Sequence, residues 1–293
     1  MMICSKPIIV WDLFGGGQNS VYEALKDNPL YEVYTFDITT PTRQKQYVLD
    51  LSNDSVLDEL AKYPKPDIIV ASPLCQSFSQ VLTMNGGGTC FWKLNEDGSL
   101  CERSIAEFET LKAGFTKNLK AEKQLAFKKL GEKCLINTIR IIAKYQPQYF
   151  YIENPKKSLM WNFIKHNMGL KGEYNYATYS KYGYMLPKDT CFFSNVKLDL
   201  NYQPRFKNCY EKDGYLIPNN LGEEFKIYKG SGRRQLLAWS ACVGQGKKYV
   251  PKAYGGKENE ETSSIPKLLI QDIFKHFEVK ENEKMIWKSQ KNY

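Results

Sequence analysis

The first 80 residues alternate short apolar runs with segments of helical periodicity. Runs rich in Ile, Val, Tyr and Phe, which favour strands, lie at 6–14, 31–38, 46–51 and 66–73. Amphipathic segments lie at 20–28, with Ser20 as the expected N-cap, and at 55–63. Strands that alternate with helices predict parallel βαβ units. We therefore expect an α/β fold in which ligands bind at the carboxyl ends of the strands.

After the first 80 residues, the pattern of hydrophobic and polar positions changes several times along the chain. A Lys-rich helical stretch at 104–144 precedes a strand at 148–155, and Tyr-rich runs at 175–184 and 191–198 indicate antiparallel strands and turns. An irregular region with little periodicity follows, and the last pattern is an amphipathic helix with Pro266 in its first turn. These changes predict three regions, at 1–195, 196–262 and 263–293.

Composition narrows the class of protein. The 293 residues suffice for one large domain with an appendage or for two modest domains. Apolar residues never form the run of about 18 that a membrane span needs, and the N-terminus lacks a secretory pattern. Eight dispersed cysteines without a C-x-x-C pair, and only two histidines, argue against a disulfide framework or a zinc site. We expect a soluble cytoplasmic protein that binds no membrane and no metal.

The chain is basic. Its formal charge of +9, from 41 Lys and Arg against 32 Asp and Glu, favours a polyanionic partner. Charge alone is weak evidence, since many basic proteins bind no nucleic acid. The Lys-rich stretch at 117–133 has two interpretations, a solvated helix face or a face that contacts phosphates.

Glycines and acids follow the first three predicted strands. The first strand runs into Asp12-Leu13-Phe14-Gly15-Gly16-Gly17, where glycines allow a sharp turn close to a ligand. The second ends at Asp37, a position from which a carboxylate can accept ribose hydroxyls, and Asp50 after the third could accept from an adenine amino group. Each acid alone is more often a cap or a surface charge, but together they predict a nucleoside pocket. No Lys follows the glycines, which disfavours a P-loop.

A thiol and a carboxylate follow the next two predicted strands. Cys75 comes after Ser72-Pro73-Leu74, a stiff loop at the mouth of the sheet, whereas a structural Cys is usually buried within an element. Glu153 lies at the end of the neighbouring strand, before Asn154 and Pro155. The pair suits addition to a pyrimidine, with the thiolate at C6 and the acid at N3. The alternatives are a small buried side chain for Cys75 and a surface ion pair for Glu153.

The order of these motifs resembles that of the C5-cytosine DNA methyltransferases. Asp-Leu-Phe-Gly is followed by Ser-Pro-x-Cys-Gln-Ser-Phe-Ser, Glu-Asn-Pro, a Tyr-Gly segment and a late Ser-x-Ile-Pro helix. The likeness covers residues 7–195 and 263–277, and the Cys75 loop is its most specific part. The resemblance implies a Rossmann-like methyltransferase fold, S-adenosylmethionine as the methyl donor, and a target base flipped out of double-stranded DNA.

The resemblance also implies roles for individual residues and regions. Cys75 matches the nucleophile, and Glu153 the acid that binds N3. Contacts to the cofactor fall to Asp12, Phe14, Gly15, Gly16, Gly17, Asp37, Asp50, Ser72 and Pro73. Contacts to the substrate fall to Gln76, Ser77, Asn154, Lys188, Arg233 and Arg234. Residues 1–195 are then the catalytic domain, 196–262 the target-recognition region, and 263–293 a helix that returns to the catalytic domain.

Four positions depart from the family's pattern. Leu74 stands where the family usually has Pro, Gln18 where it has Gly, and Pro155 where many members have Val. The family often carries two arginines after Tyr-Gly, where this chain offers only Lys188. The nucleophile and the acid are retained. The departures bear on the rate of methylation and indicate a divergent bacterial or phage-type member.

The resemblance also sets the expected partners. We expect a monomer that acts on double-stranded DNA, with a cognate restriction enzyme as a candidate partner. Three alternatives stay open: methylation of cytosine in RNA, a catalytically silent nucleic-acid-binding protein of the same fold, and methylation of an amino group. The last needs a Pro-Pro-aromatic loop, and here the corresponding loop ends in Cys75.

Overall fold

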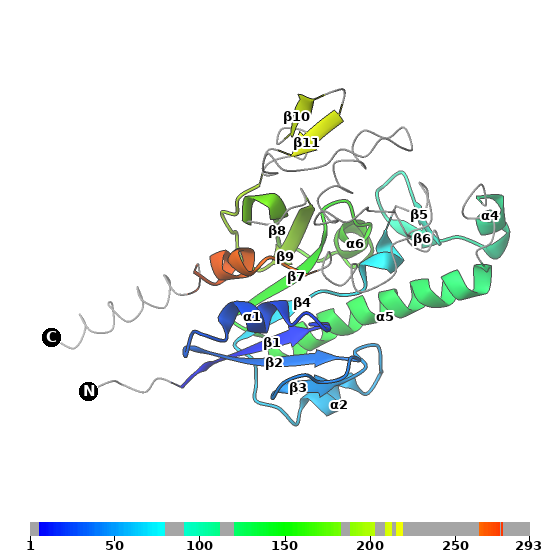
Figure 1. Ribbon diagram of the computed structural model, residues 1–293. Coiled ribbons are helices and arrows are strands. Elements are labelled where there is room, and N and C mark those ends of the chain that lie inside the picture. The colour runs from blue at the N-terminus through cyan, green and yellow to red at the C-terminus, as the bar shows by residue number, and fades with distance from the viewer. Residues whose placement is uncertain are drawn as a thin grey trace, which may run out of the picture. The chain divides into compact units, whose positions relative to one another are not determined.

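The protein is built on a seven-stranded, mostly parallel β-sheet with associated helices (Figure 1). The computed structural model describes residues 6–79, 91–111, 120–182, 188–202, 209–212, 215–218, 264–275 and 277. The strands of the sheet are β1 (Ile8–Leu13), β2 (Tyr31–Asp37), β3 (Gln46–Val48), β4 (Ile68–Ala71), β7 (Tyr149–Pro155), β8 (Glu173–Thr178) and β9 (Asp189–Ser194). The expected α/β class is confirmed.

The strand order reverses beside β1. The sheet runs β3-β2-β1-β4-β7-β9-β8, and the pairs β1–β2, β1–β4, β2–β3 and β4–β7 are parallel. From β1 the chain moves outward through β2 and β3, and then crosses to the other side of β1 to form β4. In open α/β sheets, ligands bind outside the carboxyl ends of the strands at such a reversal. The ends of β1 and β4 are therefore where a site is expected.

The last two strands of the sheet run antiparallel to each other. Gly172, just before β8, faces Phe193 near the end of β9, while the Thr178 hydroxyl at the end of β8 donates to Asp189 at the start of β9 (3.1 Å). The start of one strand therefore lies against the end of the other, as the sequence predicts. A further antiparallel hairpin, β5 (Trp92–Leu94) with β6 (Leu100–Glu102), follows the Cys75 segment.

Several helices and short helical turns follow the strands. They are α1 (Ser20–Leu25), α2 (Val56–Leu60), η1 (Cys75–Phe78), α4 (Ile105–Thr110), α5 (Ala121–Tyr145), α6 (Met160–Asn162), η3 (Phe163–Asn167) and η4 (Tyr179–Tyr182). The stretch expected to be helical over 104–144 contains α4 and α5, whose ends lie side by side in Figure 1, and residues 112–119 lie outside the described ranges. Ser104 and Glu107 form a capping box that begins α4.

The prediction that Ser20 caps the first helix is wrong. Asn19 occupies the N-cap of α1 with a φ of 47°, and Ser20 is the first helical residue. The Ser20 hydroxyl instead accepts a hydrogen bond from the backbone N–H of Ile265 (3.2 Å). A contact 245 residues away in the sequence thus competes for the oxygen that a local cap would use.

Among the described residues, the hydrophobic core includes two large clusters and a smaller one of Phe91, Phe108 and Ala121. The first large cluster contains Trp11, Phe36, Leu60, Ile69 and Ile141, and the second contains Phe78, Trp92, Leu135, Ile152 and Phe163. The helix α5 supplies residues to both large clusters, so it spans the breadth of this core. All four residues of β4 are buried, because a parallel strand is covered on both faces. That burial accounts for the uninterrupted apolar runs in the sequence.

The chain groups into two compact units. The first comprises 1–17, 28–174 and 191–197, and the second gathers 18–27, 175–190 and the described part of 198–293. In the second unit, the helical residues 267–275 contact α1 through Gln271, whose amide donates to Ala24 (3.1 Å), and contact η4 through Asp272, which accepts from Tyr182 (2.9 Å). The strands β10 (Cys209–Lys212) and β11 (Tyr215–Pro218) form a hairpin within the region expected to be irregular. No helix among the described residues has the length and apolarity to cross a bilayer.

Candidate active site

The turn after β1 approaches its neighbours too closely to carry a side chain at Gly15. A Cβ there would overlap the Asp12 carboxylate and the Thr35 side chain. Gly16 has a φ of +60°, and its N–H donates to Asp37 (2.9 Å) at the end of β2. Phe14 also has a positive φ (64°), which is costly for an aromatic residue. Strain of this kind accumulates at functional sites, so the turn is a candidate ligand cradle.

Asp12 is a buried acid at the point where the strand order reverses. It is 4% exposed, accepts a hydrogen bond from the Thr35 hydroxyl (3.3 Å), and burial raises its pKa to about 7. The Thr35 hydrogen bond and the charge of Arg43 oppose this rise in pKa, and Arg43 itself donates to the Thr35 hydroxyl. Thr35 and Arg43 belong to no sequence motif that would mark them as site residues. Only the fold brings them to this end of β1.

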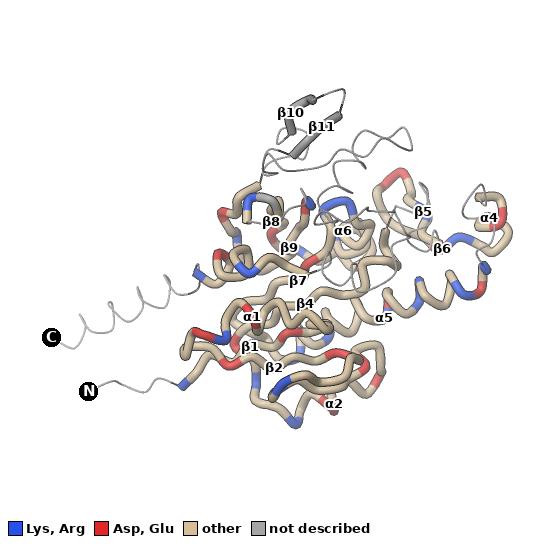
Figure 2. The backbone as a smooth tube through the Cα atoms, in the orientation of Figure 1, with Lys and Arg blue, Asp and Glu red and all other residues tan. Residues whose placement is uncertain are grey.

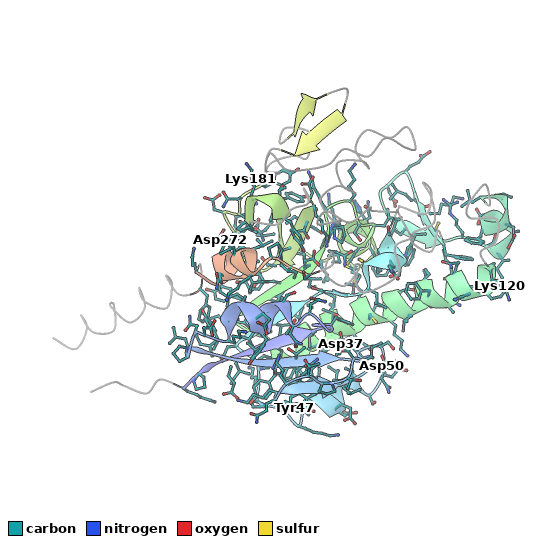
Figure 3. All side chains as sticks on the ribbon, viewed as in Figure 1. Asp37, Tyr47, Asp50, Lys120, Lys181 and Asp272 are labelled. Carbon is teal, nitrogen blue, oxygen red and sulfur yellow. The ribbon has the colours of Figure 1, made fainter. Side chains whose placement is uncertain are left out.

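Asp37 and Asp50 lie at the carboxyl ends of adjacent strands, and Figure 3 labels both. The Asp37 carboxylate also accepts from the Thr39 N–H (2.9 Å), and Asp50 accepts from the Ser52 N–H and hydroxyl (2.9 and 2.6 Å). A carboxylate has about four acceptor positions, so both acids can accept further hydrogen bonds. The two acids therefore suit a ligand with hydroxyl and amino donors.

Two apolar side chains beside these acids were missed from the sequence. Ile38 follows Asp37 and is 72% exposed, and Val48 pairs with Asp37 in the sheet and is 62% exposed. In the sequence, the signal for Ile38 was an apolar residue directly after the acid, at a position where the chain leaves the sheet. Exposed apolar groups next to carboxylates can contact the face of a heterocycle while the acids bind its polar groups.

No group of three or more His, Cys, Asp or Glu within the described ranges could hold a metal ion.

The Cys75 loop, which runs from Ser72 through η1, is anchored on several sides. Cys75 is exposed and is the first residue of η1, which follows β4 after Ser72, Pro73 and Leu74. The Ser72 N–H donates to Leu13 at the end of β1 (3.1 Å), and the buried Asn154 amide donates to the Pro73 carbonyl (2.9 Å). The loop that carries the thiol is thus bound to β1 and to β7. A nucleophile needs this kind of restraint to meet its target in one geometry.

Glu153 lies on β7, beside β4, the strand that leads to Cys75. Ala71 pairs with Ile152, so the next residue on each strand, Ser72 and Glu153, stands at the same edge of the sheet. Glu153 is 6% exposed. The Trp161 indole N–H donates to the Pro155 carbonyl (2.9 Å) and holds the end of this strand. The expected placement of the acid and the thiol at neighbouring strand ends agrees with this register.

The helix α5 contacts the Cys75 loop through Gly131. A Cβ at Gly131 would overlap the Ser77 hydroxyl, so only glycine allows this approach. Ser77 is 1% exposed and donates to the Leu74 carbonyl (2.9 Å), whereas Gln76 is exposed. Ser77 therefore stabilises the conformation of the loop through a buried hydrogen bond, and of these two side chains Gln76 is the one that can reach a ligand.

The remaining predicted substrate residues lie in the second unit or outside the described residues. Lys188 belongs to the second unit, where its ammonium lies 4.7 Å from the centre of the Tyr179 ring. Arg233 and Arg234 lie outside the described residues. Their expected roles as substrate contacts stay predictions.

The Lys-rich part of α5 is not uniformly solvated. Lys128 is 3% exposed and forms ion pairs with Glu102 (2.9 Å) and Glu132 (2.7 Å), so it cannot contact phosphates. Lys120, Lys123 and Lys129 are exposed, and the basic positions along the helix are visible in Figure 2. Both earlier interpretations of this stretch are therefore incomplete, because one of its cations is internal.

A comparison with solved structures finds distant likenesses to this chain. No family model matches the chain, and no curated protein is significantly similar in sequence. Among solved structures, the chain is similar to the Entamoeba histolytica methyltransferase EhMeth, with 12% identity and a TM-score of 0.42 over 92% of this chain and 97% of that chain.

Proposed function

We propose that the protein is a Rossmann-like methyltransferase that transfers a methyl group from S-adenosylmethionine to C5 of cytosine in DNA. One observation carries the proposal. The Asn154 amide binds the Pro73 carbonyl and so joins the loop of Cys75 to the strand of Glu153, beside the reversal of the strand order. A thiol and a carboxyl fixed at adjacent strand ends match the requirements of addition to a pyrimidine ring.

The residues at the ends of β1, β2 and β3 fit the methyl donor. Gly15 lets the turn after β1 pack against Asp12 and Thr35, and Asp37 and Asp50 have acceptor positions for the ribose hydroxyls and the adenine amino group. Ile38 and Val48 offer exposed apolar surface for the adenine ring. When bound, S-adenosylmethionine supplies an electrophilic methyl group on its sulfonium sulfur.

The proposed reaction begins with Cys75. Its thiolate adds to C6 of cytosine, which makes C5 nucleophilic, and Glu153 stabilises the adduct by hydrogen bonding at N3. C5 then takes the methyl group as the S–CH3 bond breaks, which leaves S-adenosylhomocysteine as a neutral thioether. Transfer of the C5 proton to water restores the double bond and releases the thiolate, so Cys75 is regenerated.

DNA is the proposed substrate because the chemistry needs an accessible base and the chain is basic. A base in a duplex must leave the stack, at a cost of a few kcal/mol, which contacts to phosphates can offset. The exposed Lys120, Lys123 and Lys129 are candidates for such contacts. We further propose that residues 196–262, with Arg233 and Arg234, select the target sequence, since base edges are read by side chains of this kind.

Duplex DNA containing 5-fluorocytosine tests the proposal. With S-adenosylmethionine present, the fluorine blocks proton loss from C5, so the protein should stay covalently attached to the DNA. Cys75→Ser should abolish both the adduct and the methylation of normal cytosine, measured by bisulfite sequencing. The control is Cys101→Ser on β6, where the half-buried thiol lies 3.3 Å from the Asn95 side-chain oxygen.

Three results would contradict the proposal in different ways. Methylation of C5 by Cys75→Ser at the wild-type rate would exclude this nucleophile. Preference for transfer RNA over duplex DNA in a competition assay would assign the same chemistry to RNA. Binding of S-adenosylmethionine without methyl transfer to any nucleic acid would indicate a silent member of the fold.

A further inference from the structure

A buried lysine lies behind the Cys75 loop. The Lys128 ammonium is 3.8 Å from the centre of the Trp92 ring and forms ion pairs with Glu102 and Glu132. At 3% exposure, Lys128 has lost almost all of its hydration, which is unfavourable unless partners replace the water. Two carboxylates and one aromatic face do so here, and they define a single position for the cation.

Trp92 connects this cation to the loop. Its ring stacks on Phe78, the last residue of η1, with centroids 5.6 Å apart and planes inclined by 14°. Phe163 contacts both rings, at 5.9 Å from Phe78 and 5.3 Å from Trp92. The side chain beneath Lys128 therefore packs directly on the segment that begins with Cys75.

The same face of α5 contacts the loop a second time. Gly131 lies against Ser77, and it follows Lys128 by three residues, a spacing that puts both on one side of a helix. One side of α5 therefore supports two consecutive residues of η1, Ser77 directly and Phe78 through Trp92. Because this helix face supports both residues, a shift of the face would shift the Cys75 loop.

We propose that Lys128 is a positioning residue that, through Trp92, sets the orientation of η1 and so of the Cys75 thiol. The role rests on the proposed function of Cys75 as the nucleophile. An apolar residue at 128 would fill the space, but it would leave Glu102 and Glu132 facing each other without a cation between them. A misplacement of about 1 Å in such a support can cost about a hundredfold in rate. The charge of Lys128 therefore matters in addition to its volume.

Two substitutions in the full-length protein separate charge from volume. Lys128→Met keeps the length of the side chain and should lower kcat for DNA methylation about tenfold or more, while KM for S-adenosylmethionine stays unchanged. Lys128→Arg keeps a cation over the Trp92 ring and should restore kcat to within about threefold of wild type. Lys144→Met removes an exposed lysine from the far end of the same helix and serves as the control.

A second measurement needs no DNA. The rate at which iodoacetamide alkylates Cys75 at pH 7, followed on the Cys75 peptide by mass spectrometry, should fall about threefold or more in Lys128→Met and stay near wild type in Lys128→Arg. If Lys128→Met does not fold, Trp92→Phe takes its place. The smaller ring under the same ammonium should lower kcat about threefold without changing KM for the cofactor.

The outcomes distinguish this inference from the proposed function. A folded Lys128→Met protein with wild-type kcat and wild-type alkylation overturns the inference, as does an equal loss in Lys128→Met and Lys128→Arg. A loss of cofactor affinity as large as the loss of kcat would indicate general damage and also overturn it. If the wild-type protein methylates no nucleic acid, the proposed function fails, and the alkylation rates still decide whether Lys128 positions the thiol.

Discussion

The side-chain amide of Asn154 donates a hydrogen bond of 2.9 Å to the backbone carbonyl of Pro73, 81 residues earlier in the chain. Both groups are buried, so the bond forms without competition from water. It joins the Cys75 loop to β7, in addition to the pairing of β4 with β7 and the hydrogen bond from the Leu159 N–H to the Phe78 carbonyl (2.9 Å). The relative placement of Cys75 and Glu153 therefore depends in part on this amide donor.

Asn154→Asp is expected to break this link. A carboxylate would face the Pro73 carbonyl, and two buried acceptors without a donor should lower the free energy of unfolding by about 2 kcal/mol. Methylation should fall about tenfold or more, because the Cys75 loop loses an anchor. Urea denaturation and initial rates are the measurements. Asn195→Asp is the control, since Asn195 makes the same bond to Gln148 (2.9 Å) in an exposed position; equal effects of the two substitutions would contradict the prediction.

Asp37→Ala should weaken the binding of S-adenosylmethionine by about 1 to 2 kcal/mol, the scale of a hydrogen bond to a charged group. The same substitution removes the acceptor for the Gly16 N–H, so the turn also loses an anchor. Titration calorimetry measures the affinity. Asp58→Ala, an exposed acid in the first turn of α2, should leave it unchanged. Undiminished affinity in a folded Asp37→Ala protein would remove this acid from the pocket.

Gly15→Ala and Gly17→Ala form a matched pair in the turn after β1. The new methyl group at 15 would overlap Asp12 and Thr35, whereas nothing lies within 4 Å of a Cβ at 17. We expect Gly15→Ala to lower the free energy of unfolding by about 1 to 3 kcal/mol and to weaken the binding of S-adenosylmethionine about tenfold. Gly17→Ala should leave the free energy of unfolding near that of wild type. Thermal unfolding and calorimetry check both, and a tolerated alanine at 15 would show that the turn can relax.

Asp12 should make stability depend on pH. Burial raises its pKa from 3.8 to about 7, so the folded state holds a proton that the unfolded state has released over this range. The contribution is fully present below pH 3.8 and is lost as pH rises through about 7, with a total of about 4 kcal/mol. Asp12→Asn stays neutral and should flatten this slope. Urea unfolding of both proteins at pH 5, 6, 7 and 8 measures it, and parallel slopes would contradict the assignment.

The sequence by itself determined the elements and the strand ends that carry the candidate chemistry. Asp37, Cys75 and Glu153 could be placed at strand ends because strand patterns are local. Apolar side chains recur at a short spacing along a strand, and this spacing stops where the strand ends. The parallel pairing of β1 with β2 and with β4 also follows from strands that alternate with helices. For these features, residues that are close in the chain contain the information.

Only the tertiary structure decided which distant groups share an environment. The bond from Asn154 to Pro73, the contact of Gly131 with Ser77 and the acceptance of the Ile265 N–H by Ser20 each join segments that no local pattern relates. Lys128 shows the difference most clearly. It lies on the buried stripe of α5 with Gly131, whereas the Lys-rich sequence predicts a solvated or phosphate-contacting helix face, because a lysine is normally solvated. Its burial depends on Glu102 and Trp92, which reach it only after the chain has folded.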